Sequence, residues 1–177
     1  GATGETITVT AAGAGQTRVT STAGESTTFN NPTASLEINA GDTGNDVVTL
    51  TALGSGFNAS LAIDGGTGTD TITITPSLNL SLAGASLTLS AETINLNGGT
   101  ITTNGNQTYN GAVTLGSDTT TSGANVAFNG TVNSGLTGTT FQILTLGTSN
   151  SAVVDHNAVT SDDRGGIAIS TTQVFYS

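Results

Sequence analysis

Two stretches, SLEINAGDTGNDVVTL (residues 35–50) and SLAIDGGTGTDTITI (residues 60–74), are copies of one pattern and decide the fold. The offset between them is 25 residues in the first half and 24 in the second, because residue 42 is an insertion. A unit of this length is too short to bury its own apolar face, so each copy has to stack on a neighbour. The repeat therefore predicts a β-solenoid with a coil of about 24 residues.

Short alternating segments continue the pattern outside these copies, for example at residues 5–10, 78–82, 86–89, 93–96 and 112–115. In each of them aliphatic residues alternate with Thr, Ser or Asn, which is the period of a strand with one buried face. No window keeps the apolar spacing of a helix. Nine side chains are expected to point into the core: Val48, Ile72, Ile74, Leu80, Leu89, Leu96, Val113, Leu115 and Phe128.

The turns between these segments permit two all-β folds. Asn-Gly dipeptides, as at residues 97–98 and 110–111, serve as tight hairpins in an antiparallel β-sandwich or as corners in a solenoid. The internal repeat favours the solenoid. We therefore expect one β-solenoid domain over residues 1–177, with atypical end regions at residues 1–34 and 136–177, and keep the antiparallel sandwich as the alternative.

The composition excludes several classes of partner. Thr occurs 37 times and Gly 25 times among 177 residues, whereas Cys, Lys, Met and Trp are absent. Two Arg face 12 carboxylates, for a net charge of −10, which repels nucleic acid. No apolar run approaches the roughly 20 residues that cross a bilayer, so membrane insertion is not expected. A Thr-, Asn- and Gly-rich chain without Cys or Lys favours a secreted or cell-surface protein.

The Gly-rich segments point to calcium as a possible ligand. Residues 65–73 fit the G-G-x-G-x-D-x-U-x nonapeptide of calcium-binding β-rolls, and residues 41–49 fit it with Asp42 in place of the second Gly. Asp46 and Asp70 would then supply carboxylate oxygens beside turn carbonyls. The spacing of the two copies differs from that in coils made of two nonapeptides. The alternative is that these Gly-Asp turns only form corners of the chain.

Catalysis is not expected from this sequence, and no residue is assigned a catalytic role. The one histidine, His156, has no Gly-x-Ser-x-Gly nucleophile motif to accompany it. Asp162 and Asp163 form the densest acidic cluster, and a polysaccharide-acting β-helix enzyme could use paired carboxylates. Adjacent strand residues point to opposite faces, however, and Gly165-Gly166 follows, which favours a solvated turn.

Part of the chain resembles a known class of surface protein. Residues 59–68, 106–115 and 124–132 are similar to repeat regions of giant bacterial surface proteins of the filamentous-haemagglutinin and autotransporter-adhesin type. The resemblance implies a right-handed parallel β-helix, export, and a role in adhesion or surface architecture. It implies no catalytic or binding residue, and it identifies no glycan or host receptor.

The two ends of the chain suggest self-association. A solenoid leaves strand edges at both ends of its stack, and charged residues, the usual protection of such edges, are scarce at both termini. The first strand offers Ile7 and Val9, and the last offers Val174, Phe175 and Tyr176. Strand addition between copies would be head to tail and would propagate into a filament. We therefore expect an extracellular structural protein that assembles end to end, or a segment of a large surface adhesin.

Overall fold

The structure, a computed structural model, describes residues 4–41, 43–135, 142–146, 151–154 and 167–170. Their regular structure is entirely β, as expected from the sequence, and none of them form a helix that is long and apolar enough to cross a membrane. The strands are β1 (Thr6–Gly13), β2 (Gln16–Ser21), β3 (Thr27–Asn30), β4 (Ser35–Asn39), β5 (Val47–Leu50), β6 (Ser60–Asp64), β7 (Thr71–Ile74), β8 (Leu78–Leu80), β9 (Leu87–Leu96), β10 (Thr100–Thr103), β11 (Gln107–Leu115), β12 (Thr119–Ser122), β13 (Asn125–Phe128), β14 (Val132–Ser134), β15 (Gln142–Leu146), β16 (Ser151–Val154) and β17 (Ile167–Ser170).

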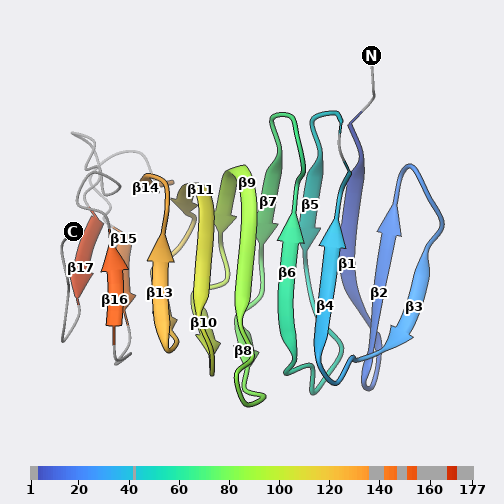
Figure 1. Ribbon diagram of the computed structural model, residues 1–177, viewed down its shortest axis with the longest axis horizontal. Helices are drawn as coiled ribbons and strands as arrows, with labels where there is room; N and C mark the ends of the chain where they lie inside the picture. Colours follow the sequence, from blue (N-terminus) through green and yellow to red (C-terminus); the bar gives the residue numbers. More distant parts are fainter. Residues whose placement is uncertain (1–3, 42, 136–141, 147–150, 155–166, 171–177) are drawn as a thin grey trace.

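Successive coils place their strands on three faces of one stack (Figure 1). The first face holds β4, β6, the first halves of β9 and β11, β13 and β16. The second face holds β1, β5, β7, the second halves of β9 and β11, and β14. The third face holds β8, β10, β12, β15 and β17. All of these pairings are parallel, so the fold is a parallel β-solenoid and the antiparallel sandwich is wrong.

The strand register confirms the repeat but corrects the length of the coil. Ser35 lies opposite Ser60 and Val47 lies opposite Thr71, which are the two offsets that the sequence copies show. Further along the stack the coil shortens, since Asn129 Nδ2 donates to Asn110 Oδ1 across a separation of only 19 residues. The predicted coil length is therefore right for the repeat itself and wrong for the middle of the stack.

The shortening takes place at the corner between the first and second faces. Residues 40–46 separate β4 from β5, and residues 65–70 separate β6 from β7. In the next two coils the strand runs through the corner, with two residues between Ser90 and Thr93 in β9 and only Gly111 at the equivalent point of β11. The loss of corner residues from the first coil to the fourth accounts for the whole difference in length between these two coils.

The core is a set of vertical rows of side chains, one residue per coil. One row on the first face runs from Ile38 through Ile63 and Leu89 to Tyr109 and Phe128. The rings of Tyr109 and Phe128 stack with their centroids 4.7 Å apart. All nine residues that the alternation predicts to face inward are buried, namely Val48, Ile72, Ile74, Leu80, Leu89, Leu96, Val113, Leu115 and Phe128.

The N-terminal end of the stack is built differently, as an antiparallel three-stranded meander. β1 pairs in parallel with β5 and antiparallel with β2, which pairs antiparallel with β3. Polar side chains join the meander to the first coil, because Gly54 N donates to the buried Thr17 Oγ1 and Thr17 Oγ1 donates to Asn31 Oδ1, both at 3.0 Å. Asn31 Nδ2 in turn donates to the carbonyl oxygens of Gly54 and Ser55.

Because of this meander, β1 is not the strand with a free edge at this end of the stack. Both edges of β1 are paired, and the side chains of Ile7 and Val9 are buried in the core. The expectation that these two residues lie on an unpaired edge is therefore wrong, because β2 pairs with the edge of β1 that β5 leaves free. Val174, Phe175 and Tyr176 lie outside the described residues, so their part in self-association stays a prediction.

Candidate functional site

The two nonapeptide segments form the long corners between the first and second faces. Each begins with the same local turn, in which Asn39 Oδ1 accepts from Gly41 N at 2.9 Å and Asp64 Oδ1 accepts from Gly66 N at 3.0 Å. A side-chain oxygen that bonds the backbone two residues ahead mimics a backbone turn. The repeated sequence therefore produces the same corner twice.

The two corners stack directly on each other. Asp46 N donates to Asp70 Oδ1 at 2.8 Å, and Thr69 N donates to Asn45 Oδ1 at 3.1 Å. The in-register pairing of the flanking strands brings together two turns that are 24 residues apart in the sequence. The unusual spacing, which argues against a calcium β-roll, thus does not separate the two Gly-Asp turns.

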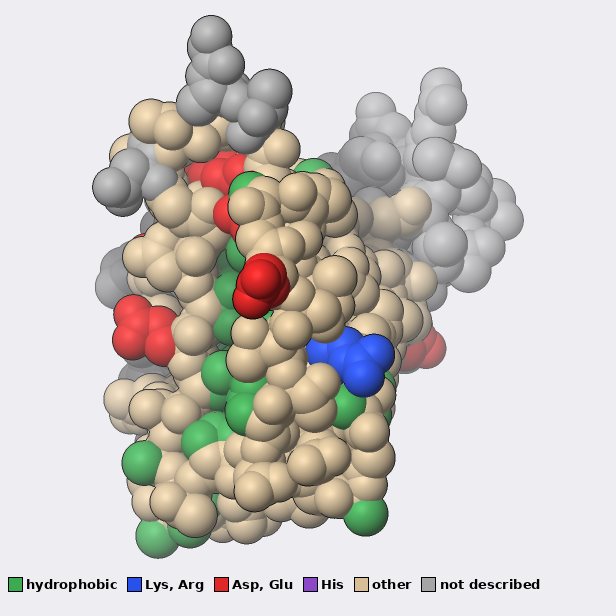
Figure 2. Space-filling model, turned by 90° about the vertical axis from the view of Figure 1, so that its right-hand side faces the viewer, with side chains coloured by type: hydrophobic (Ala, Val, Ile, Leu, Met, Phe, Trp, Pro, Cys, Tyr) green, Lys and Arg blue, Asp and Glu red, His purple; other side chains and the backbone are tan. Residues whose placement is uncertain are grey.

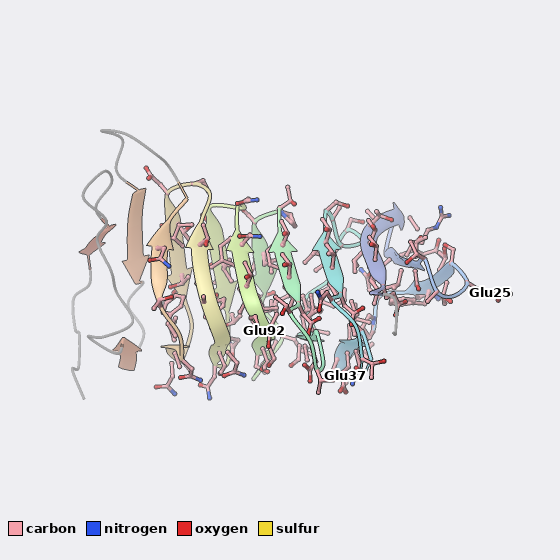
Figure 3. The ribbon with its side chains drawn as sticks, turned by 90° about the horizontal axis from the view of Figure 1, so that it is seen from above. Glu25, Glu37 and Glu92 are labelled. Carbon is pink, nitrogen blue, oxygen red and sulfur yellow. The ribbon has the colours of Figure 1, made fainter. Side chains whose placement is uncertain are left out.

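Asp46 and Asp70 belong to a longer ladder of acidic residues at this corner. Glu5 N donates to Asp46 Oδ1, Asp46 N to Asp70 Oδ1, and Asp70 N to Glu92 Oε2 at 2.7 Å. The carboxylates of Asp46, Asp70 and Glu92 each accept the backbone N–H of the acidic residue one coil before, whereas the carboxylate of Glu5 accepts from Ser21 Oγ. Glu92, labelled in Figure 3, is the last residue of the ladder, and its side chain is exposed to solvent. The ladder therefore locks successive coils together at their corner.

Burial sets the two aspartates apart from the two glutamates. Asp46 and Asp70 are each only 1% exposed, whereas Glu92 is exposed and Glu5 is half-buried. Oδ1 of each aspartate has a backbone partner, but Oδ2 of each is buried without a hydrogen-bond partner among the residues that the structure describes. A buried carboxylate oxygen without a partner is costly, because the charged group has lost its water.

Sequence reasoning found Asp46 and Asp70 but missed Glu5 and Glu92. The signal was present, because an acidic residue precedes each of the first four strands of the second face, in the motifs ETITV (residues 5–9), DVVTL (46–50), DTITI (70–74) and ETINL (92–96). The nonapeptide covers only the middle two of these motifs. In the following coil Gly111 takes the position of the acidic residue, and the ladder ends.

A metal at this corner would depend on a small set of protein ligands. The described part of the chain contains no group of three or more His, Cys, Asp or Glu side chains that could hold a metal ion. The available donors are the two buried aspartates and turn carbonyls, a mixture of oxygens that suits calcium.

The other residues that the sequence singles out, namely Asp42, His156, Asp162 and Asp163, lie outside the described residues.

The ladder predicts a sharp difference between two substitutions of Asp70. In calcium-free buffer Asp70→Ala is expected to lower the free energy of unfolding by about 2 kcal/mol, because Asp46 N–H loses its acceptor while buried. Asp70→Asn keeps an acceptor oxygen for Asp46 N–H and is expected to lose less than Asp70→Ala, staying within about 1 kcal/mol of the parent chain. Urea denaturation of the three proteins measures this difference. Equal losses for Ala and Asn would show that the charge, rather than the acceptor, supports the corner.

Comparison of the whole chain with known protein families, with curated proteins and with solved structures finds no match.

Proposed function

We propose that this protein is a structural element of an extracellular surface assembly, in which solenoids join end to end. Support comes first from the exterior of the stack. On the second face the outward residue of each coil follows the row Thr8, Thr49, Thr73, Asn95 and Thr114. Such uncharged hydroxyl and amide side chains suit the surface of a rigid, hydrated rod that has a structural role.

The observation that carries the proposal is the free edge of β4. This strand pairs only with β6, and no backbone hydrogen bond from another described segment reaches its other side. Ala34 O and Ala40 N bond to the β6 segment. Because backbone groups alternate sides along a parallel strand, those of Ser35, Glu37 and Asn39 point away from β6. A strand edge of this kind is a template for a strand from another chain.

Side chains around this edge are only partly covered. Leu36 on β4 is only partly buried against the core. Figure 2 looks onto the N-terminal end of the stack and shows hydrophobic side chains in a narrow stripe, with few charged groups. An added strand would cover part of this apolar surface in addition to forming main-chain hydrogen bonds.

Glu37→Pro is expected to abolish association at this end while leaving the fold intact. Proline removes the outward N–H of Glu37, and it is tolerated at the solvent side of an edge strand. Sedimentation velocity and electron microscopy should show filaments or oligomers for the parent chain and monomers for the variant. Thermal melting of the variant should remain cooperative, because the β4–β6 hydrogen bonds do not use that N–H.

Two further variants complete the test. Glu37→Thr keeps the N–H and removes an exposed charge from the edge (Figure 3), so it should associate at least as strongly as the parent. A chain that lacks residues 171–177 tests the predicted role of Val174, Phe175 and Tyr176 at the other end. A parent chain that stays monomeric at high concentration would refute end-to-end assembly.

That the protein is not an enzyme stays a prediction. Assays on pectin and alginate check it, with Asp163→Ala as the control variant.

A further inference from the structure

We propose that the stacked Gly-Asp turns bind one calcium ion between Asp46 and Asp70. The inference goes beyond the proposed structural role and does not depend on end-to-end association. It rests on two buried carboxylates in adjacent coils, each 1% exposed and each with an Oδ2 that has no partner among the described residues. A bound cation would supply the partner that each of these oxygens lacks.

Charge balance points to a cation from solution. Adjacent coils are about 4.8 Å apart, so the two carboxylates repel each other in a site from which water is excluded. Arg18 is the only Lys or Arg in the described residues, and its Nε donates to Thr28 Oγ1 in the N-terminal meander. The described part of the chain therefore supplies backbone N–H groups to the two carboxylates but no neutralising side chain.

The glycines of the turn keep the backbone close to the Asp70 side chain, and backbone carbonyls are the further ligands that the proposal requires. A Cβ atom at Gly65 would lie 2.5 Å from Asp70 Cβ and 3.0 Å from Asp70 Oδ2, so glycine lets the backbone of this turn approach the Asp70 side chain closely. At Gly68 a Cβ atom would overlap the carbonyl oxygen of Gly44, which shows how tightly the two turns pack. Calcium accepts mixed carboxylate and carbonyl ligands in irregular geometry, whereas magnesium requires near-octahedral geometry and keeps several waters.

Calorimetric titration of the full chain, freed of metal with EDTA, tests the proposal directly. We expect calcium chloride to bind with a stoichiometry of one per chain. At about 100 times its dissociation constant, calcium should raise the melting temperature by about 5–10 °C. Asp70→Asn should lose both the heat of binding and the shift. Asp64→Asn is the matched control, because Asp64 is exposed on the same corner and its Oδ1 only accepts from Gly66 N.

Three outcomes would overturn the proposal. The first is the absence of heat and of a thermal shift in the parent chain at millimolar calcium. The second is an equal shift with magnesium at the same ionic strength, which would indicate general screening of the acidic surface. The third is unchanged binding by a folded Asp70→Asn variant, which would place the ion at other carboxylates. If that variant does not fold, the parent titration with calcium and magnesium still decides.

Discussion

Gly111→Ala is expected to lower the free energy of unfolding by about 4 kcal/mol, as the sum of about 2–3 kcal/mol for steric overlap and about 1–2 kcal/mol for backbone strain. Gly111 lies in the middle of β11 at the point where the coil becomes one residue shorter. A Cβ atom there would overlap the carbonyl oxygen of Ala91 in the coil before it. The residue also has a φ of +149°, which side chains rarely adopt.

Gly84→Ala separates the two contributions. Gly84 has a φ of +77°, but a Cβ atom there would meet no atom within 4 Å. Its replacement should therefore cost only the strain of a positive φ, about 1–2 kcal/mol. Urea denaturation with an unchanged slope would give both values on one scale. If the two variants lose the same free energy, the approach of β11 to β9 at Gly111 is looser than the structure shows.

The stacking of the coils could be predicted because it repeats in the sequence. Two copies with the same alternation place Ile38 opposite Ile63 and Val48 opposite Ile72, and the structure has both pairs. The inward side of each strand follows from its period of two, so every predicted core residue is buried. Repeat and alternation together specify the core of a solenoid without any knowledge of its turns.

The coil length could not be predicted beyond the repeat, because it is decided at one corner. Strands β9 and β11 pass through that corner with a bulge in place of a turn. A segment such as residues 87–96 alternates on both sides of Ala91 and Glu92, and alternation does not show where the chain changes face. Deleting corner residues alters the length of a coil but leaves the stacked positions unchanged.

The antiparallel strand that covers the edge of β1 could not be predicted for a related reason. Residues 6–10 alternate in the same way as β5 and β7, and β1 does pair in parallel with β5. The following strands turn back through residues 14–15, so that β2 and β3 pair antiparallel. Alternation is identical in parallel and antiparallel strands, so it could not show that β1 is covered.

Only two of the four acidic residues in the ladder could be predicted from the sequence. The nonapeptide identified Asp46 and Asp70 through the glycines that precede them, which only long corners need. Glu5 and Glu92 occupy the same place in the ladder but have no such turn before them. Their common feature is the position just before a strand of the second face, where Glu5 gives its backbone N–H to Asp46 and Glu92 accepts the N–H of Asp70.

Gln107→Leu is expected to lower the free energy of unfolding by about 3 kcal/mol, although leucine suits the shape of the site. The stacked positions in the two preceding coils are Leu87 and Leu61. Gln107 is fully buried, and its Nε2 donates to the carbonyl oxygens of Ile101 and Ser122 at 3.1 and 2.8 Å.

The hydroxyl of Tyr109, also fully buried, donates to Gln107 Oε1 at 2.7 Å. Removing the amide leaves this hydroxyl unpaired in the core, which costs about 1–3 kcal/mol, and also removes the bonds to the two carbonyls. Tyr109→Phe alone should cost about 1.5 kcal/mol, since it leaves only Gln107 Oε1 unpaired.

The double variant Gln107→Leu/Tyr109→Phe should recover the part of the loss that comes from the unpaired hydroxyl and lie about 1–2 kcal/mol below the parent, because the bonds from Gln107 to the two carbonyls stay lost. A pH series adds a second readout. Burial raises the pKa of Tyr109 above its usual value, so only the unfolded chain loses this proton at about pH 10. The stability that Tyr109 confers is therefore constant below that pH and falls above it, and the deficit of Tyr109→Phe should shrink between pH 8 and pH 11. Additive losses in the double variant, or a deficit that does not change with pH, would show that this hydroxyl is not held in a dry core.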